Sequence, residues 1–162
     1  MIEVLYSDNH VLAVLKPAGV PVVPDDSGDP SLLEGAKAWV KKEFEKPGKV
    51  FLGVVHRLDR PVSGIVVFAR TSKGAARLSK AWQEGKVKKG YQGFSEQDWP
   101  SEKMQGELEQ WLWKDGKKNK VHVVKEATEG SKRAKTKWMI AAQEKGKTFL
   151  WLEPVTGRSH QL

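Results

Sequence analysis

The sequence has no cysteine, only two tyrosines and no long apolar run. The absence of cysteine in all 162 residues excludes disulfide scaffolds, cysteine nucleophiles and zinc fingers. No stretch approaches the roughly 18 apolar residues that a membrane-spanning helix needs. The first residues also lack the basic and apolar regions of a secretory signal. We therefore expect a cytoplasmic protein without a membrane segment.

Several motifs of catalysis and ligand binding are missing as well. The chain contains no G-x-x-x-x-G-K-[ST] or G-x-G-x-x-G phosphate loop and no G-x-S-x-G hydrolase elbow. Its four histidines, at positions 10, 56, 122 and 160, do not have the spacing of metal ligands. We expect neither a metal nor an organic cofactor.

What the chain has in excess is positive charge, with a net +8 that is unevenly spread. Residues 1–60 carry 8 Lys/Arg against 9 Asp/Glu, whereas residues 61–162 carry 20 against 11. A basic surface of this kind suits a polyanion, and nucleic acid is the first candidate. A well-solvated lysine-rich face would give the same count, so charge alone does not decide.

The hydrophobic pattern predicts helices early and strands late. Short apolar runs at 11–15, 52–55 and 65–69 indicate strands. Ser31 opens a helix to about residue 44 with Glu34 completing a capping box, and Thr71 or Ser72 opens a second helix to about Glu84. The pattern favours an α+β fold: a mixed, largely antiparallel central sheet with flanking helices. Without a long linker, residues 1–162 are expected to form a single domain.

The second half of the chain changes to a strand-like period of two. Arg133, Lys135 and Lys137 alternate with residues that suit a buried face, and residues 144–147 are a plausible hairpin turn. Trp138 and Trp151 fit buried strand positions. Trp111 and Trp113 lie beside the basic run Lys117-Lys118-Asn119-Lys120, where they either stack on exposed bases or pack in the sheet.

Three short segments concentrate polar side chains that are suited to catalysis or binding. In the first, Asp59 lies between Arg57 and Arg60, which keep a carboxylate ionised, ready to act as nucleophile or base. The alternative is a structural ion pair that closes the loop. In the second, Arg158 follows Gly157 and is able to reach a phosphate or carboxylate, unless the segment is only a loose basic end. In the third, Tyr91 lies between two glycines, where a tyrosine packed in the sheet is the competing interpretation.

Together these segments resemble the RluA-type family of RNA pseudouridine synthases. The sequence Lys16-Pro17-Ala18-Gly19 resembles the family's "KPaG" turn, and residues 56–64 match H-R-L-D-x-x-[TS]-S-G with valine at position 62, where threonine is usual. Lys89-Gly90-Tyr91 matches K-x-Y, and residues 157–162 match G-R-[ST]-H-Q-[IL]. The motifs occur in the family's order and extend over nearly the whole chain.

The resemblance implies roles for the polar residues. Asp59 aligns with the catalytic aspartate, needed to break and remake the glycosidic bond of a uridine that is rejoined through C5. Tyr91 aligns with the tyrosine that is proposed to help remove the C5 proton, and Arg158 with the arginine that pairs with the aspartate. Arg57 aligns with an arginine thought to fill the space of the flipped nucleotide. With it, His56 and Arg60 are expected to contact RNA.

The resemblance also sets expectations for partners and extent. The partner is expected to be rRNA or tRNA, not DNA, bound by a monomer. We expect no separate S4-like domain, and a catalytic domain truncated at its C-terminal end, since family members continue past the last motif. A non-catalytic RNA-binding homologue of the same fold is the main alternative. A basic α+β binding domain of other ancestry is the third.

Overall fold

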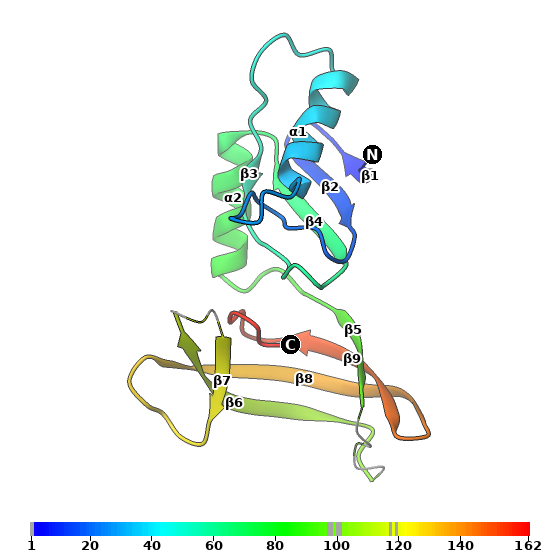
Figure 1. The fold of residues 1–162 in the computed structure, drawn as a ribbon, viewed down its shortest axis with the longest axis vertical. Coiled ribbons are helices and arrows are strands. Elements are labelled where there is room, and N and C mark those ends of the chain that lie inside the picture. Colours follow the sequence, from blue (N-terminus) through cyan, green and yellow to red (C-terminus); the bar gives the residue numbers. More distant parts are fainter. Residues whose placement is uncertain (1, 97–98, 100–101, 117, 119) are drawn as a thin grey trace. The chain divides into compact units, whose positions relative to one another are not determined.

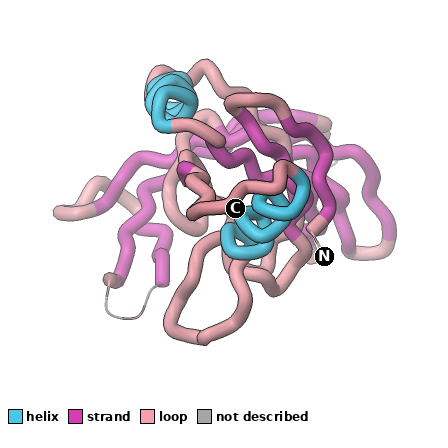
Figure 2. The backbone as a smooth tube through the Cα atoms, turned by 90° about the horizontal axis from the view of Figure 1, so that it is seen from above, coloured by secondary structure: helices cyan, strands magenta, loops and turns pink. Residues whose placement is uncertain are grey.

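The computed structural model describes residues 2–96, 99, 102–116, 118 and 120–162. The chain forms two compact units, Met1–Lys86 and Val87–Leu162, which are considered one at a time. Both helices belong to the first unit (Figures 1 and 2). No helix among these described residues is long and apolar enough to cross a membrane.

The first unit is a four-stranded antiparallel sheet with two helices. Its strands are β1 (Glu3–Ser7), β2 (Val11–Lys16), β3 (Gly53–Val54) and β4 (Gly64–Ala69), in the order β1-β2-β4-β3. Helix α1 (Leu32–Glu43) follows a long loop after β2, and α2 (Ser72–Gln83) follows β4. The loop between β3 and β4, residues 55–63, carries the H-R-L-D segment.

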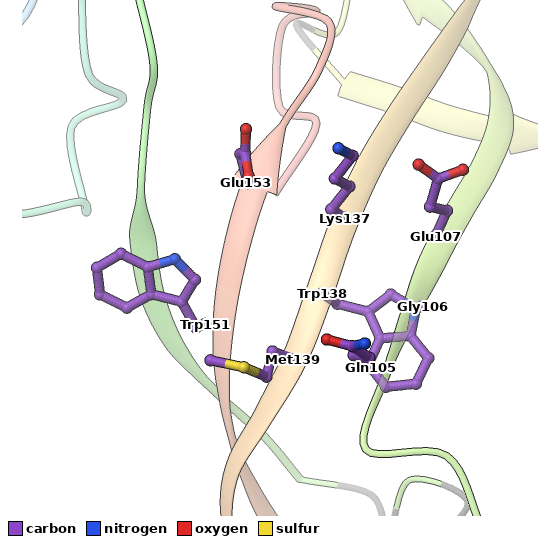
Figure 3. A pocket seen from close by; sticks show the side chains of 8 residues that line it. All are labelled: Gln105, Gly106, Glu107, Lys137, Trp138, Met139, Trp151 and Glu153. Atoms are coloured by element: carbon purple, nitrogen blue, oxygen red, sulfur yellow. The ribbon is translucent and has the colours of Figure 1, made fainter.

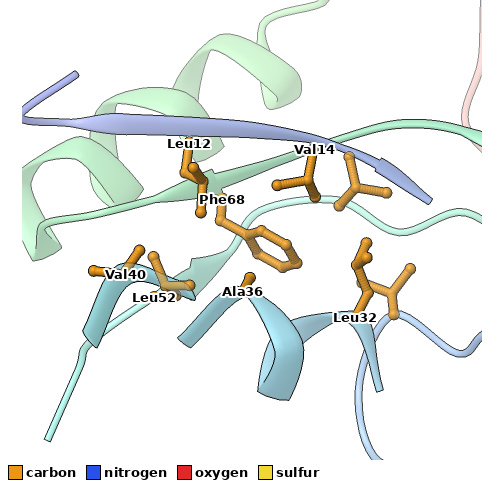
Figure 4. Close-up of a cluster of buried hydrophobic side chains, with 9 residues drawn as sticks. Leu12, Val14, Leu32, Ala36, Val40, Leu52 and Phe68 are labelled. Atoms are coloured by element: carbon orange, nitrogen blue, oxygen red, sulfur yellow. The ribbon is translucent and has the colours of Figure 1, made fainter. Parts of the chain in front are cut away.

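The core of this unit lies between α1 and the middle of the sheet (Figure 4). Register pairs Leu12 with Phe68 and Val14 with Val66, which places all four side chains on one sheet face, where each is fully buried. Helix α1 covers them with residues spaced four apart: Leu32, Ala36 and Val40. The spacing of apolar residues in the sequence therefore produced the expected packing.

The second unit is a five-stranded antiparallel sheet in the order β5-β9-β8-β6-β7. The strands are β5 (Tyr91–Ser95), β6 (Gln105–Asp115), β7 (Lys120–Val124), β8 (Ser131–Glu144) and β9 (Lys147–Pro154). Ala134, Thr136, Ile140, Thr148 and Leu150 are buried on one face. The predicted hairpin is present, with Lys145 and Gly146 at positive φ between the paired Glu144 and Lys147.

The predicted α+β fold with largely antiparallel pairing is confirmed, with the strands divided between two sheets. The position expected for Trp151 is wrong: its side chain is 43% exposed. In β9 the buried residues Thr148, Leu150 and Pro154 occupy alternate positions, which leaves Trp151 on the other face of the sheet. The expectation that residues 1–162 form one domain stays a prediction.

Helix α1 begins with the predicted capping box. The Ser31 hydroxyl accepts from the Glu34 backbone N–H at 3.3 Å, and the Glu34 carboxylate accepts from the Ser31 backbone N–H at 2.9 Å. Both Ser31 donors, the backbone N–H first and then the hydroxyl, lower the pKa of Glu34. Because the folded-state pKa is lowered, this stabilisation is present above the ordinary glutamate pKa and is lost as pH falls through the folded value.

We expect Ser31→Ala to lower the free energy of unfolding by about 1 kcal/mol at neutral pH. The loss should shrink in acid, because protonation of Glu34 weakens the bond that the Ser31 hydroxyl, absent from the variant, donates to its carboxylate. Urea denaturation at neutral and acidic pH measures both effects. The control is Ser72→Ala, an exposed serine inside the first turn of α2 that does not cap it. An equal loss in both variants would contradict the capping role.

Candidate active site

The loop that carries Asp59 makes a tight turn. The backbone carbonyl of Asp59 accepts from the Val62 N–H at 3.0 Å, which leaves the Asp59 and Arg57 side chains exposed. Gly64 ends the loop at φ +146°, and a Cβ there would lie 3.3 Å from the Leu58 side chain. The carboxylate is therefore exposed to solvent in the turn that precedes strand β4.

Beneath this loop lies a buried lysine that the sequence analysis did not single out. Lys16 takes the third inward position of β2, after Leu12 and Val14, and is fully buried. Its ammonium donates to three backbone carbonyls, those of Pro17 at 3.0 Å, Val20 at 2.8 Å and Arg60 at 3.0 Å. All three ammonium protons therefore have acceptors, and one acceptor is the residue after Asp59.

The pKa of Lys16 also depends on the charges around the loop. Burial, and then the nearby positive charge of Arg60, lower the pKa of Lys16, while the negative charge of Asp59 opposes them. The buried ammonium thus lies within electrostatic reach of the Asp59 carboxylate. The Lys16 ammonium is thus a fixed positive charge near the carboxylate, although the two groups are not in direct contact.

Arg60 ties the same loop to residues 19–29. Its guanidinium donates to the Gly19 carbonyl at 2.9 Å and the Ser27 hydroxyl at 3.0 Å, and forms ion pairs with Asp25 and Asp29. The Gly19 N–H returns a bond to the Arg60 carbonyl at 2.8 Å. The Arg60 guanidinium is therefore already bound by partners within the first unit.

Asp59, by contrast, forms no ion pair with any residue that the structure describes. The structural alternative from the sequence, an Arg–Asp pair that closes the loop, is built instead from Arg60 with Asp25 and Asp29. The backbone of Asp59 is anchored in the turn, and its carboxylate remains available to an external group. This combination is what a positioned catalytic carboxylate requires.

His56 is engaged inside the first unit as well. Its Nε2 accepts from the Val67 backbone N–H at 2.9 Å, and its ring stacks on Trp82 of α2 with centroids 4.6 Å apart. The ring therefore joins the start of the H-R-L-D segment to β4 and α2. Its predicted contact with RNA stays a prediction.

The Lys89-Gly90-Tyr91 segment enters strand β5 of the second unit. Tyr91 is half-buried opposite Leu152, and the Trp151 ring lies so close to Gly90 that a Cβ there would be 2.6 Å from it. Lys89 donates to the Thr156 carbonyl at 3.3 Å, and its burial lowers its pKa. The K-x-Y motif thus touches the segment that carries Arg158.

A second residue that the sequence analysis did not single out, Gln161, holds that segment on β8. Its amide oxygen accepts from the Thr156 hydroxyl at 2.8 Å and the Arg158 N–H at 3.0 Å. Its amide nitrogen donates to the Lys135 carbonyl at 3.0 Å and the Thr136 hydroxyl at 2.9 Å. The Gln161 side chain therefore uses both of its donors and both of its acceptor sites.

Arg158 is exposed but anchored. Its Nε donates to the Arg133 carbonyl of β8 at 3.0 Å. Its backbone is fixed by Gln161, so the guanidinium keeps its remaining donors for another partner.

We expect Gln161→Ala to lower the free energy of unfolding by roughly 2 kcal/mol, since it removes the donor to the buried Thr136 hydroxyl and the acceptor for Thr156 and Arg158. Chemical denaturation followed by tryptophan fluorescence measures the loss. Gln92→Ala, an exposed glutamine of β5, is the control and should change stability by less than about 0.5 kcal/mol. If the two variants are equally stable, Gln161 does not hold the segment.

The candidate residues therefore fall in two groups. Asp59, Arg57, Arg60 and His56 belong to the first unit, and Tyr91 and Arg158 to the second. A separate groove of about 480 Å³ lies on the second sheet between Trp151, Met139 and Lys137 and contains none of them (Figure 3). No cluster of three acidic, histidine or cysteine side chains suited to a metal ion occurs in the described part of the chain.

Comparison with known proteins agrees with the motifs. The family model described as RNA pseudouridylate synthase matches residues 10–162, which include every candidate residue. The chain belongs to this family. Its relatives of the RluA and RluC types place it with the RluA-type pseudouridine synthases.

Three curated members of the family illustrate the similarity. An uncharacterised RNA pseudouridine synthase of Zymomonas mobilis is 38% identical over 161 residues, which are 99% of this chain and 69% of the relative. The dual-specificity RNA pseudouridine synthase RluA of Haemophilus influenzae is 33% identical, with the same two coverages. Ribosomal large subunit pseudouridine synthase C of Escherichia coli is 29% identical, and the match covers 98% of this chain but 47% of the relative.

Solved structures of the family share the fold. Human RNA pseudouridylate synthase domain containing 4 superposes with a TM-score of 0.80 at 20% identity, covering 98% of this chain and 61% of the human chain. Human RNA pseudouridylate synthase domain containing 1 gives 0.73 at 18% identity, covering 99% and 62%. This pseudouridine synthase chain therefore spans about two thirds or less of the proteins that it matches.

Proposed function

We propose that this chain isomerises uridine in RNA to pseudouridine, with Asp59 as its catalytic carboxylate. The observation that carries the proposal is the H-R-L-D loop itself. Lys16 and Arg60 fix its backbone, while Asp59 is exposed and has no ion-pair partner in the described structure. An unpaired carboxylate on an anchored stretch of backbone is suited to act on a substrate atom.

The reaction breaks the N1–C1′ bond of the uridine and forms a C5–C1′ bond. The proton on C5 leaves, and N1 of the rotated base gains one. Asp59 is proposed to assist the breaking and remaking of the bond to C1′. Tyr91 is proposed to help remove the C5 proton, and Arg158, whose backbone Gln161 holds, to pair with Asp59.

The target nucleotide must leave the helical stack before Asp59 can reach it, at a cost of a few kcal/mol. Exposed Arg57, two residues from Asp59, is proposed to occupy the space that it leaves. His56 and Arg60 have contacts that support a structural role. His56 contacts Val67 and Trp82, and Arg60 contacts Gly19 and Asp29. We propose that they hold the loop from which Arg57 and Asp59 project.

The substrate is proposed to be rRNA or tRNA. Among the relatives, one name specifies the large ribosomal subunit and another dual specificity. We further propose that both units form one catalytic domain, since one family model matches residues 10–162. The protein is proposed to act as a monomer in the cytoplasm.

The test is tritium release from rRNA and tRNA labelled at uridine C5. Pseudouridine formation expels the C5 hydrogen, so active protein should release tritium into water and leave an equal amount of pseudouridine in the digested RNA. RNA binding without tritium release from either RNA would instead favour the non-catalytic RNA-binding homologue.

A further inference from the structure

The hairpin of β6 and β7 presents an aromatic pair that the proposed chemistry does not use. Trp113 and His122 lie opposite each other in the ladder, with ring centroids 6.0 Å apart and planes at 37°. Trp113 is 38% exposed and His122 is exposed. Strand β7 is the edge of its sheet (Figure 1), so one side of this pair has no neighbouring strand.

Positive charge surrounds the pair. Residues 111–133 contain seven lysines and arginines against three acidic residues, a net +4. Exposed Lys120, two residues before His122, and exposed Arg133, the register partner of Trp111, share the sheet face of the aromatic pair. Lys114 and Lys132 lie at alternate positions and point to the other face. Of the basic run in this hairpin, Lys117 and Asn119 lie outside the described residues.

The hairpin adjoins the candidate site within its own unit. Arg158 donates to the backbone carbonyl of Arg133, and Arg133 pairs in register with Trp111, two residues before Trp113 on the same sheet face. Trp111 itself is half-buried, so Trp113 is the indole available to an external ring. The surface is therefore continuous with the arginine that is proposed to pair with Asp59.

We infer that this surface, consisting of Trp113, His122, Lys120 and Arg133, binds the RNA nucleotides that flank the target uridine. Aromatic rings beside cations are suited to unpaired bases and their phosphates, since bases stack on the rings while the cations contact the backbone. The expected ligand is single-stranded or loop RNA, in which bases are already exposed. The inference rests on the proposed function, because it takes the same RNA as substrate.

The structure favours RNA over a protein partner on this face. An apolar docking surface would be poor in cations, whereas here exposed Lys120 and Arg133 share the sheet face of the aromatic pair. Gly130 also approaches the Trp113 indole, with a Cβ position 3.6 Å from its Nε1, while 38% of the residue remains exposed. A partly exposed ring is what a stacking platform needs.

The test measures RNA affinity in the Asp59→Asn background, so that turnover does not alter the ligand. Trp113→Ala should weaken binding of a labelled RNA hairpin about tenfold. Changing Lys120 and Arg133 together to glutamine should reduce the slope of log affinity against log salt by about 1.4, because two phosphate contacts are lost. Thermal unfolding of each variant confirms that it is folded.

The controls come from the same unit. Phe94→Ala removes an aromatic side chain that is 76% exposed on β5, and the glutamine double variant at Lys145 and Lys147 removes an equal charge. Neither should change affinity more than about twofold. If the hairpin variants bind like these controls while wild-type protein still releases tritium, the inference fails and the proposed function stands. If wild type neither binds RNA nor releases tritium, both fail.

Discussion

Asp59→Asn is expected to reduce pseudouridine formation by about a thousandfold or more while leaving RNA affinity unchanged. The amide keeps the size of the carboxylate but removes its charge and its nucleophilic oxygen. Because Asp59 is exposed and forms no ion pair with the residues described, its replacement should not destabilise the fold by more than about 0.5 kcal/mol. Tritium release, filter binding and thermal unfolding measure the three quantities.

The matched control for this variant is Asp26→Asn. Asp26 is an exposed aspartate of the loop between β2 and α1, in the same unit and with the same change of charge. It should keep wild-type turnover. If Asp59→Asn retains more than about a tenth of the wild-type rate, Asp59 is not the catalytic carboxylate, whatever the effect on binding.

Lys16→Met is expected to lower the free energy of unfolding by about 2–3 kcal/mol. Methionine retains most of the apolar stem but leaves the carbonyls of Pro17, Val20 and Arg60 without the ammonium that links them. The Arg60 carbonyl keeps only its bond from Gly19. Since the backbone beside Asp59 then loses an anchor, turnover should fall even at temperatures where the variant is fully folded.

Urea denaturation gives the stability change, and tritium release at a temperature well below the transition gives the change in turnover. Lys37→Met, a half-buried lysine on α1 within the same unit, is the control and should alter both only slightly. A Lys16→Met variant with full activity would show that the buried lysine does not position the Asp59 loop.

Local signals in the sequence predicted much of the fold. The Ser31 and Glu34 pair placed the start of α1 correctly, because a capping box depends only on residues three apart. The alternation around Ala134 and Thr136 in β8 predicted its buried face for the same reason. Each of these signals is complete within a few residues of sequence.

The roles of Lys16 and Gln161 did not follow from such signals. Lys16 ends an apolar run, where a lysine usually marks the return to solvent. One of its acceptors, the Arg60 carbonyl, lies 44 residues away. The sequence showed Gln161 only as one position of the last motif, since its partners Lys135 and Thr136 belong to strand β8, about 25 residues earlier in the chain. Contacts that depend on tertiary pairing are not encoded in local spacing.

Trp151 shows a different limit. It was expected at a buried strand position, but β9 places even-numbered residues inward and Trp151 is odd-numbered. The register shift in β8 between Ile140 and Ala142 further changes which residues face each other across the hairpin. In a strand the phase, rather than hydrophobicity, decides which side is covered.

The proposed reaction requires that Asp59 share one site with Arg158 and Tyr91. The cysteine-free sequence allows this to be measured with a double variant, Asp59→Cys with Arg158→Cys, treated with a short bifunctional thiol reagent. Groups of one site should lie within about 12 Å, so we predict rapid cross-linking within the monomer. The register partners Glu107→Cys and Lys137→Cys provide the positive control. If that control cross-links and the Asp59–Arg158 pair does not, the two residues do not form one site.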